Sequence, residues 1–234
     1  MHDLPPFPGF RDEAFTFLKQ LKKNNERDWF KPRQETYQDE VQWPLRCLVA
    51  DAARQAASQD LPLTGDPKKG LFRIYRDTRF SKNKLPYKTH ASAVLSRSGS
   101  RKDNGVVYIH IEPGASFIGG GYWRPDNDLL WPWRTQMAQH PVGFLEVVRK
   151  LETADLELDP DRDKLKRMPR GFQNYAESDV ADYLRWKSFV VTRPVLDEAL
   201  QTPNFTDHVI AIAKDMLPLL EYGWDLLDKV PAKL

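Results

Sequence analysis

The chain has 234 residues, of which 41% are hydrophobic and 29% are charged, and it carries 35 basic and 33 acidic side chains. This composition excludes a disordered or fibrous protein, and the length suits a single domain over residues 1–234 that buries roughly 70% of its unfolded surface without a disulfide or metal. The sequence has no apolar run near the ~18 residues of a membrane helix, and its first ten residues lack a secretory pattern. Together with the single cysteine, Cys47, this predicts a cytoplasmic protein with no membrane partner.

The net charge of +2 is unevenly distributed along the chain. Residues 68–102 contain eleven Lys or Arg and one acid, Asp77, so this segment carries +10 and the rest of the chain −8. Such a segment favours a partner that is an anion: a phosphate, a carboxylate or a nucleic acid. The alternative is a solvated basic loop that acidic neighbours neutralise in the folded protein.

The first part of the chain is predicted to be helical. Apolar residues at helical spacing indicate an amphipathic helix over residues 11–23. A second helix begins near Pro32 and carries Pro44 in its interior, where a proline is expected to kink it. Residues 59–70, which contain Pro and Gly, are predicted to form a loop.

The hydrophobic period then changes from helical to strand-like. Short strands are predicted over residues 71–76, 93–96, 106–112 and 116–122. The sequence Glu112-Pro113-Gly114-Ala115 is typical of a hairpin turn between the last two.

Helices return in the last part of the chain. They are expected from Asp126 or Asn127 to His140, over 141–151, over 178–187 with Ser178 as cap, and over 209–227 with Pro218 bending it. Residues 189–191 are predicted to add an edge strand that Pro194 closes. The predicted fold class is therefore α+β: a central, mostly antiparallel sheet of four or five strands, from residues 71–122 and 189–193, between N-terminal and C-terminal helices.

The basic segment contains the main candidate binding site. On a strand, Phe72 and Ile74 would face the core, while Arg73 and Asp77 would share the other face with Tyr75 and Arg79. An acid between arginines stays ionised and orients their guanidinium groups, which then can bind a phosphate or carboxylate bidentately. The predicted ligand-binding residues are Arg73, Arg76, Asp77, Arg79, Lys84, Tyr87 and Lys88. The alternative is a structural salt-bridge network.

The neighbouring predicted strand supplies candidate catalytic residues. Tyr108, His110 and Glu112 alternate with apolar residues and would share one face. If that face lies beside Arg73 and Asp77, His110 and Glu112 are suited to general acid–base chemistry on an anionic substrate. Asp77 would orient the arginines rather than act as a base, because they lower its pKa. A strand histidine with a purely structural role is the alternative for His110.

Two further features follow on the partner strand. Gly119-Gly120-Gly121 indicates either a backbone position close to a ligand, which makes Gly120 a binding candidate, or a tight bend of the sheet. Trp123, Trp131 and Trp133 would line a pocket, stack on bases, or simply pack in the core and at its rim.

Several kinds of site are not predicted. The sequence has no pair of cysteines and no histidine spacing typical of a zinc site, and the alternating acids of residues 155–163 lack the glycine and terminal glutamate of an EF-hand. It has no nucleophile elbow and no phosphate-binding glycine loop, and Cys47 lies on an apolar helical stretch. We therefore predict no metal and no cofactor.

A longer motif runs through the basic segment: Arg73-x-x-Arg76-Asp77-x-Arg79-Phe80, followed by Lys84-x-x-Tyr87. With this motif the sequence resembles a group of bacterial conserved hypothetical proteins, the domain of unknown function 2461, over nearly its whole length. Similar stretches are Asn24-Asn25-x-Arg27-x-Trp29-Phe30, Gly119-Gly120-Gly121 and Pro169-Arg170-Gly171-Phe172. A similar region also forms one part of longer fungal proteins. The resemblance implies no activity.

Three functional hypotheses follow. The first is a protein that binds a small anionic, phosphate- or carboxylate-bearing molecule and performs acid–base chemistry on it. The second is a nucleic-acid-binding module that uses the basic 68–102 segment, and the third is a partner-binding scaffold without chemistry. The sequence leaves open whether the protein is an enzyme and what its oligomeric state is.

Overall fold

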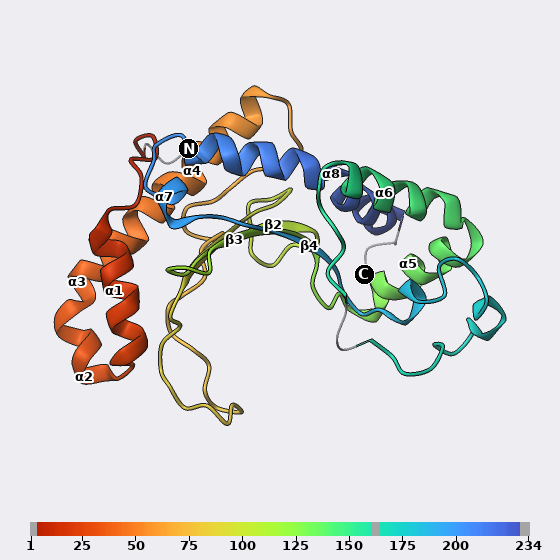
Figure 1. Cartoon of the computed structure of the whole chain (residues 1–234), viewed down its shortest axis with the longest axis horizontal. Coiled ribbons are helices and arrows are strands. Elements are labelled where there is room, and N and C mark those ends of the chain that lie inside the picture. Colours follow the sequence, from red (N-terminus) through yellow and green to blue (C-terminus); the bar gives the residue numbers. More distant parts are fainter. Residues whose placement is uncertain (1–3, 161–163, 230–234) are drawn as a thin grey trace. The chain divides into compact units, whose positions relative to one another are not determined.

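A computed structural model of the chain describes residues 4–160 and 164–229 (Figure 1). The chain divides into two compact units. The first comprises residues 1–103, 107–118 and 193–212, and the second comprises residues 104–106, 119–192 and 213–234. The prediction that they fold as one domain stays a prediction. No helix in the described part of the chain has the length and hydropathy to cross a membrane.

The first unit begins with helical segments. Helix α1 (Asp12–Lys23) confirms the first predicted helix, and its apolar face buries Phe17, Leu18 and Leu21. The second predicted helix is an irregular run that ends in a regular helix. The run comprises α2 (Arg27–Phe30), a 3₁₀ turn (Lys31–Arg33), α3 (Gln34–Thr36), a π-helical segment (Tyr37–Gln42) and α4 (Trp43–Ser58).

Pro44 explains the π-helical segment. Proline has no N–H to donate, and its ring collides with the carbonyl group four residues earlier, here that of Glu40. Glu40 lies inside the π-helical segment, whose wider turn gives the ring room. The irregularity therefore falls where the sequence predicts it.

The sheet has four strands in the order β1-β2-β3-β4, and with the helices it confirms the α+β fold class. The strands are β1 (Ala91–Leu95), β2 (Val106–Ile111), β3 (Phe117–Tyr122) and β4 (Phe189–Pro194). The turn between β2 and β3 is the predicted one: Ala115 N–H donates to Glu112 O at 2.9 Å, and Gly114 has φ of +74°. Strand β4 is the predicted edge strand, and its Val191 forms an isolated bridge with Leu158.

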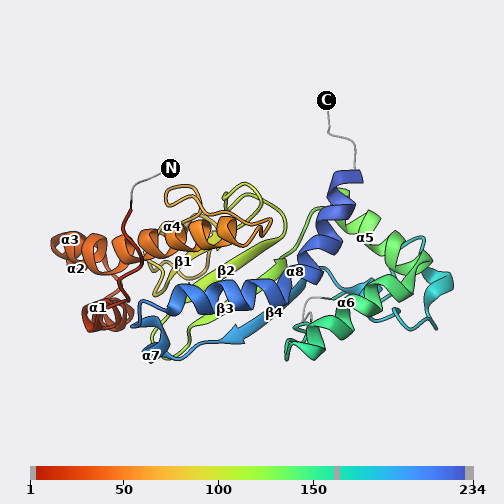
Figure 2. The ribbon, with the colours of Figure 1, turned by 90° about the horizontal axis from the view of Figure 1, so that it is seen from above.

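The register of β1 and β2 separates an apolar face from a polar one. Ala93 pairs with Ile109 and Leu95 with Val107, and all four side chains are buried. Helix α4 packs against β1, and Figure 2 shows it lying along this part of the sheet. The apolar residues face the core because directly opposite residues of an antiparallel pair point to the same side.

Residues 71–76 do not form the continuous strand that the sequence predicts. Leu71 makes only an isolated bridge with Ala93, and Tyr75 one with Tyr87. From there the chain pairs with its own returning arm, where Arg76 N–H donates to Pro86 O at 2.9 Å. Because Pro86 has no N–H to return, the ladder cannot continue, and residues 76–86 form a loop that we call the basic loop.

The second unit contains α5 (Asn127–Gln139), α6 (Pro141–Thr153) and most of the closing helix α8 (Phe205–Lys229); the short α7 (Asp197–Leu200) belongs to the first unit. Helices α5, α6 and α8 were all predicted, and Asp126 caps α5 by accepting from Leu129 N–H at 3.4 Å. Pro218 lies inside α8.

The helix predicted over residues 178–187 is wrong. Only a 3₁₀ turn, Tyr183–Arg185, forms there, and Ser178 Oγ donates back to Tyr175 O instead of capping a helix. The buried side chain of Arg134 explains the irregular backbone, because its guanidinium group donates to Leu184 O at 2.8 Å and to Trp186 O at 3.0 Å. Carbonyl groups held in this way satisfy their hydrogen bonding outside a helix.

The glycines of β3 are explained by packing. A Cβ atom on Gly120 would overlap Met216 of α8, and one on Gly121 would overlap the carbonyl oxygen of Phe189 on β4. Gly121 also has φ of +125°, which residues with a side chain rarely adopt. Of the two sequence interpretations, the structure therefore shows a close approach, but by protein rather than by a ligand.

Candidate functional site

The register of β1 and β2 gathers polar side chains on the face opposite the apolar one. Ser92 pairs with His110 and Val94 with Tyr108. The same register, continued by one residue, places His90 opposite Glu112. Since side chains at i and i+2 share a face, His90, Ser92, Tyr108, His110 and Glu112 all lie on this side of the sheet.

His110 lies at the centre of this polar face and is 9% exposed. Its Nδ1 is 3.2 Å from the hydroxyl of Tyr108, and its Nε2 is 3.3 Å from Oε2 of Glu112. The ring stacks on Phe117 with a centroid distance of 4.6 Å, and His90 lies 4.2 Å away on a second ring contact. The imidazole is thus held by contacts to both nitrogens and by two rings.

Burial, hydrogen bonds and neighbouring charges all shift the pKa values of these groups. Burial lowers the pKa of His110, and the hydrogen bond and charge of Glu112 oppose this shift. Burial raises the pKa of Glu112, but hydrogen bonds from Lys22 of α1, 3.1 Å away, and from His110 lower it below its ordinary value. Burial, with the charges of His110 and Lys88, lowers the pKa of His90 to about 4, so its imidazole is neutral at pH 7.

The buried hydroxyl group of Ser92 lies next to His110 on this face. Ser92 is 1% exposed, and its Oγ makes no hydrogen bond of acceptable geometry with any residue that the structure describes. It lies near enough to Tyr108 to lower the pKa of that phenol, which burial raises overall. A buried polar atom of this kind marks a place where a ligand or water can bind.

Three cations lie close to one another in the segment around Phe72, beside the polar face; we call Arg73, Lys88 and Arg101 the cation group. The ammonium of Lys88 lies 5.0 Å from the ring centroid of Phe72, and Nη1 of Arg101 donates to Leu71 O at 3.1 Å. Burial and the like charges of Arg101 and Arg73 lower the pKa of Lys88. No carboxylate forms an ion pair with any of the three in residues 4–160 and 164–229.

The cation group and the polar face adjoin each other through aromatic contacts. The ring of Phe72 meets that of Tyr108 edge to face at 5.7 Å, and Phe72 N–H donates to Ser92 O at 3.0 Å. The positive charge of Lys88 reaches His90. Lys88 thus lies near the polar face, whereas the charge of Arg73 reaches both Lys88 and Asp77, which lies on the basic loop.

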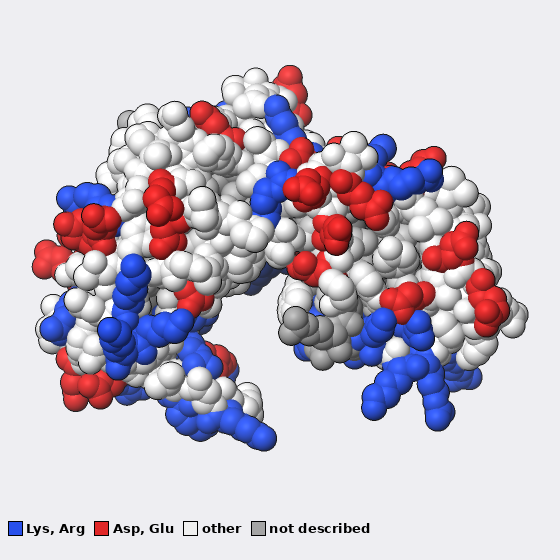
Figure 3. All heavy atoms as spheres, viewed as in Figure 1, with Lys and Arg blue, Asp and Glu red and all other residues white. Residues whose placement is uncertain are grey.

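The basic loop carries other predicted binding residues. Arg79 and Asp77 form a bidentate ion pair with each other: Nε of Arg79 donates to Oδ1 of Asp77 at 3.0 Å, and Nη2 donates to Oδ2 at 2.7 Å. Lys84 donates to Thr78 O at 2.9 Å and so ties the loop together. Figure 3 shows Lys and Arg side chains gathered over the far end of this loop.

We expect Asp77 to titrate with a pKa of about 2, because hydrogen bonds from Arg79, and more weakly the charge of Arg73, stabilise its carboxylate. Since the folded-state value lies below the ordinary value of about 4, the stabilisation is present above pH ~4 and is lost as the pH falls through about 2. Carboxyl ¹³C chemical shifts against pH measure this titration. An Arg79→Gln variant should return the pKa towards ~4, and an unchanged value in that variant would contradict the pairing.

Tyr87 has a structural role in the described fold. It is 3% exposed and stacks on Phe30 with a centroid distance of 4.2 Å. The side chain of Asn25 brackets its backbone, accepting from Tyr87 N–H and donating to Tyr87 O, both at 3.0 Å. Two stretches quoted for the resemblance, residues 24–30 and 73–87, therefore pack against each other and anchor the basic loop. Arg76 is half-buried at the root of this loop.

Gly120 and the three tryptophans Trp123, Trp131 and Trp133 lie in the second unit. The space beside Gly120, which we expected a ligand to fill, is taken by Met216. Trp133 is fully buried and stacks on Phe189 at 4.7 Å, whereas Trp123 is 72% and Trp131 53% exposed. Of the three tryptophans, one belongs to the core and two are accessible.

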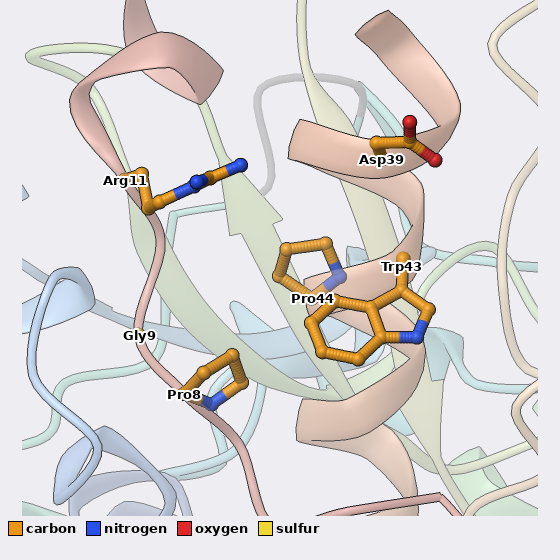
Figure 4. Close-up of a pocket in the computed structure, with 6 residues that line it drawn as sticks. All are labelled: Pro8, Gly9, Arg11, Asp39, Trp43 and Pro44. Carbon is orange, nitrogen blue, oxygen red and sulfur yellow. The ribbon is translucent and has the colours of Figure 1, made fainter. Parts of the chain in front are cut away.

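A shallow hollow of about 520 Å³ lies elsewhere in the first unit (Figure 4). Pro8, Gly9, Trp43 and Pro44 form most of its wall, and Arg11 and Asp39 lie at its edge. Arg11 is paired with Glu40. The hollow includes no residue predicted from the sequence to bind a ligand.

The sequence interpretation missed His90, Arg101 and Lys22. His90 follows Lys88 by two residues, but its place opposite Glu112 depends on the register. Arg101 and Lys22 reach the site through contacts with Leu71 and Glu112 that are distant in sequence. The only signals in the sequence were membership of the basic segment for Arg101 and a histidine just before a predicted strand for His90.

The fold and this site define an α+β protein whose sheet presents a His- and Glu-bearing face beside cations that form no ion pair with a carboxylate of the described residues. The family model described as "Conserved hypothetical protein (DUF2461)" matches residues 13–222, and the chain belongs to this family. No curated protein and no solved structure matches the chain.

Proposed function

We propose that the protein binds a small anionic molecule, bearing phosphate or carboxylate, between the cation group and the polar face of β1 and β2. The observation that carries this proposal is the set of three cations around Phe72 with no carboxylate partner among the described residues. Holding like charges together costs free energy, and an anion bound between them would remove that cost. Arg73 and Lys88 were both predicted from the sequence to bind an anion.

The surroundings support a small ligand. Phe72 and Tyr108 give an apolar wall next to the charges, a combination that ligand sites use to fix orientation. His110 and Glu112 follow on the same face, where they could act on the bound molecule. Asp77, Arg79 and Lys84 satisfy one another or the loop backbone, so in this proposal they shape the basic loop, and Arg76 and Tyr87 hold its root. Gly120 has no part in it.

Titration calorimetry with inorganic phosphate at low ionic strength tests the proposal. Arg73→Ala and Lys88→Met should each weaken binding by roughly tenfold or more, because hydrogen bonds to charged groups contribute about 1.5–3 kcal/mol. Lys82→Ala is the matched control, since it removes one exposed positive charge from the basic loop and should change the affinity little. Equal weakening in all three variants would indicate general charge attraction and contradict a defined site.

The nucleic-acid hypothesis is tested in the same preparation with a labelled single-stranded oligonucleotide. If it holds, affinity should fall with salt at a slope of about −4 to −6 in log–log form. Oligonucleotide binding with this slope, and no saturable phosphate binding, would replace the proposed function. Binding of neither would leave the partner-binding scaffold.

A further inference from the structure

The geometry points to a divalent transition-metal site formed by His90, His110 and Glu112. One ligand atom from each residue lies within 4.8 Å of the others. Two imidazoles and one carboxylate suit zinc and the neighbouring first-row metals such as Mn²⁺, Fe²⁺ and Co²⁺. Motif spacing does not indicate this site, because its ligands lie on two paired segments of the chain and meet only through the strand register.

The first supporting observation is that the ligand atoms are already directed by other contacts. The Tyr108 hydroxyl holds Nδ1 of His110, which leaves Nε2 facing Oε2 of Glu112 at 3.3 Å. The ammonium of Lys22 binds the other oxygen, Oε1, at 3.1 Å. The contact from Tyr108 is of the kind that fixes the orientation of metal ligands in proteins, whereas the positive charge of Lys22 opposes a second cation at Glu112.

The second observation concerns His90. Its ring contacts that of His110 in a tilted arrangement at a centroid distance of 4.2 Å, and its nitrogens make no hydrogen bond with any residue in the described ranges. A half-buried imidazole without a partner has a donor atom free to bind a metal next to the His110–Glu112 pair. An ordinary hydrogen bond explains that pair, but it leaves His90 unexplained.

Three protein ligands leave coordination positions open, as in metal sites that bind substrate. Here an open position would accept an oxygen atom of the anion held by the cation group. The small molecule that the protein binds would then be an oxyanion. This last step rests on the proposed function, whereas metal binding itself does not.

Titration of the metal-free protein with Zn²⁺, in a buffer without phosphate, tests the site by calorimetry. We expect one equivalent to bind, and His90→Ala and His110→Gln each to weaken binding at least tenfold, comparable to or larger than the effect of losing an outer contact. His140→Ala, which removes an exposed histidine of the second unit, is the matched control and should leave the affinity unchanged. Absence of Zn²⁺ binding, or binding that both site variants retain, would overturn the proposal.

The Lys22→Met variant should change the Zn²⁺ affinity in the opposite direction. Removing the ammonium that competes for Glu112 should tighten Zn²⁺ binding several-fold, a result that misfolding cannot produce. Binding no tighter than in the wild type would overturn the assignment of Glu112.

Co²⁺ reports the ligand set through its visible absorption. The Co²⁺-loaded protein should show a spectrum that His90→Ala alters, and added phosphate should change it further if the anion reaches the metal. A phosphate-insensitive spectrum with intact Zn²⁺ binding would overturn only the oxyanion step. Phosphate binding without metal binding would overturn the metal site and leave the proposed function standing.

Discussion

A Gly121→Ala variant is expected to lose on the order of 3 kcal/mol of unfolding free energy or to fail to fold. The new Cβ would overlap the carbonyl oxygen of Phe189, which belongs to backbone and cannot turn aside. The residue would also be held at φ of +125°, where alanine is strained. Urea unfolding followed by far-UV circular dichroism measures the loss.

Two other glycines separate the cost of the strained backbone from the cost of the Cβ overlap. Gly114 has φ of +74° and no atom within 4 Å of the place that a Cβ would occupy, so Gly114→Ala carries the strain alone and should cost about 1 kcal/mol. Gly143 lies inside α6 with the same open space, and Gly143→Ala should stabilise the protein by up to about 1 kcal/mol. If Gly121→Ala costs no more than Gly114→Ala, the contact with β4 is not as close as the structure shows.

An Arg134→Met variant should lose roughly 3 kcal/mol or more of unfolding free energy. The side chain is 7% exposed, and its two hydrogen bonds satisfy the carbonyl groups of Leu184 and Trp186. Methionine preserves much of the volume but leaves both buried acceptors unpaired, at about 1–3 kcal/mol each. The measurement is again urea unfolding, read here from tryptophan fluorescence.

Arg149→Met is the matched control, because this exposed guanidinium also binds a backbone carbonyl, that of Leu145. Its effect should stay within about 0.5 kcal/mol. Arg134→Lys should recover only part of the stability, since one ammonium cannot reproduce the two fixed directions of the guanidinium. A full recovery with lysine would show that charge, and not the paired hydrogen bonds, holds the segment.

Local patterns predicted much of this fold. The alternation in β2 correctly separates Val107 and Ile109 from Tyr108 and His110, because strand geometry alone decides it. Pro113 and Gly114 predicted the β2–β3 turn for the same reason. The segment around Ser178 was mispredicted because a buried side chain on α5, distant in sequence, binds its carbonyl groups.

The candidate site was only partly predictable. Residue types identified Arg73, Lys88, His110 and Glu112 as candidates, but their proximity depends on how β1 aligns with β2. His90 enters the site only through that alignment. Gly120 was assigned to a ligand because a sequence does not show that a helix side chain, Met216, fills the space beside it.

The alignment of β1 with β2 has a consequence for folding fidelity. A slip by one residue would turn His110 and Glu112 towards α4 and would place Ile109 and Ile111 on the polar face. Burying these ionisable groups among alanine, valine and leucine side chains would cost several kcal/mol, which disfavours the misaligned sheet. The residues proposed to bind ligand and metal therefore also specify the register of β1 and β2. Replacing them with apolar residues should yield a sheet that is stable but heterogeneous in its pairing.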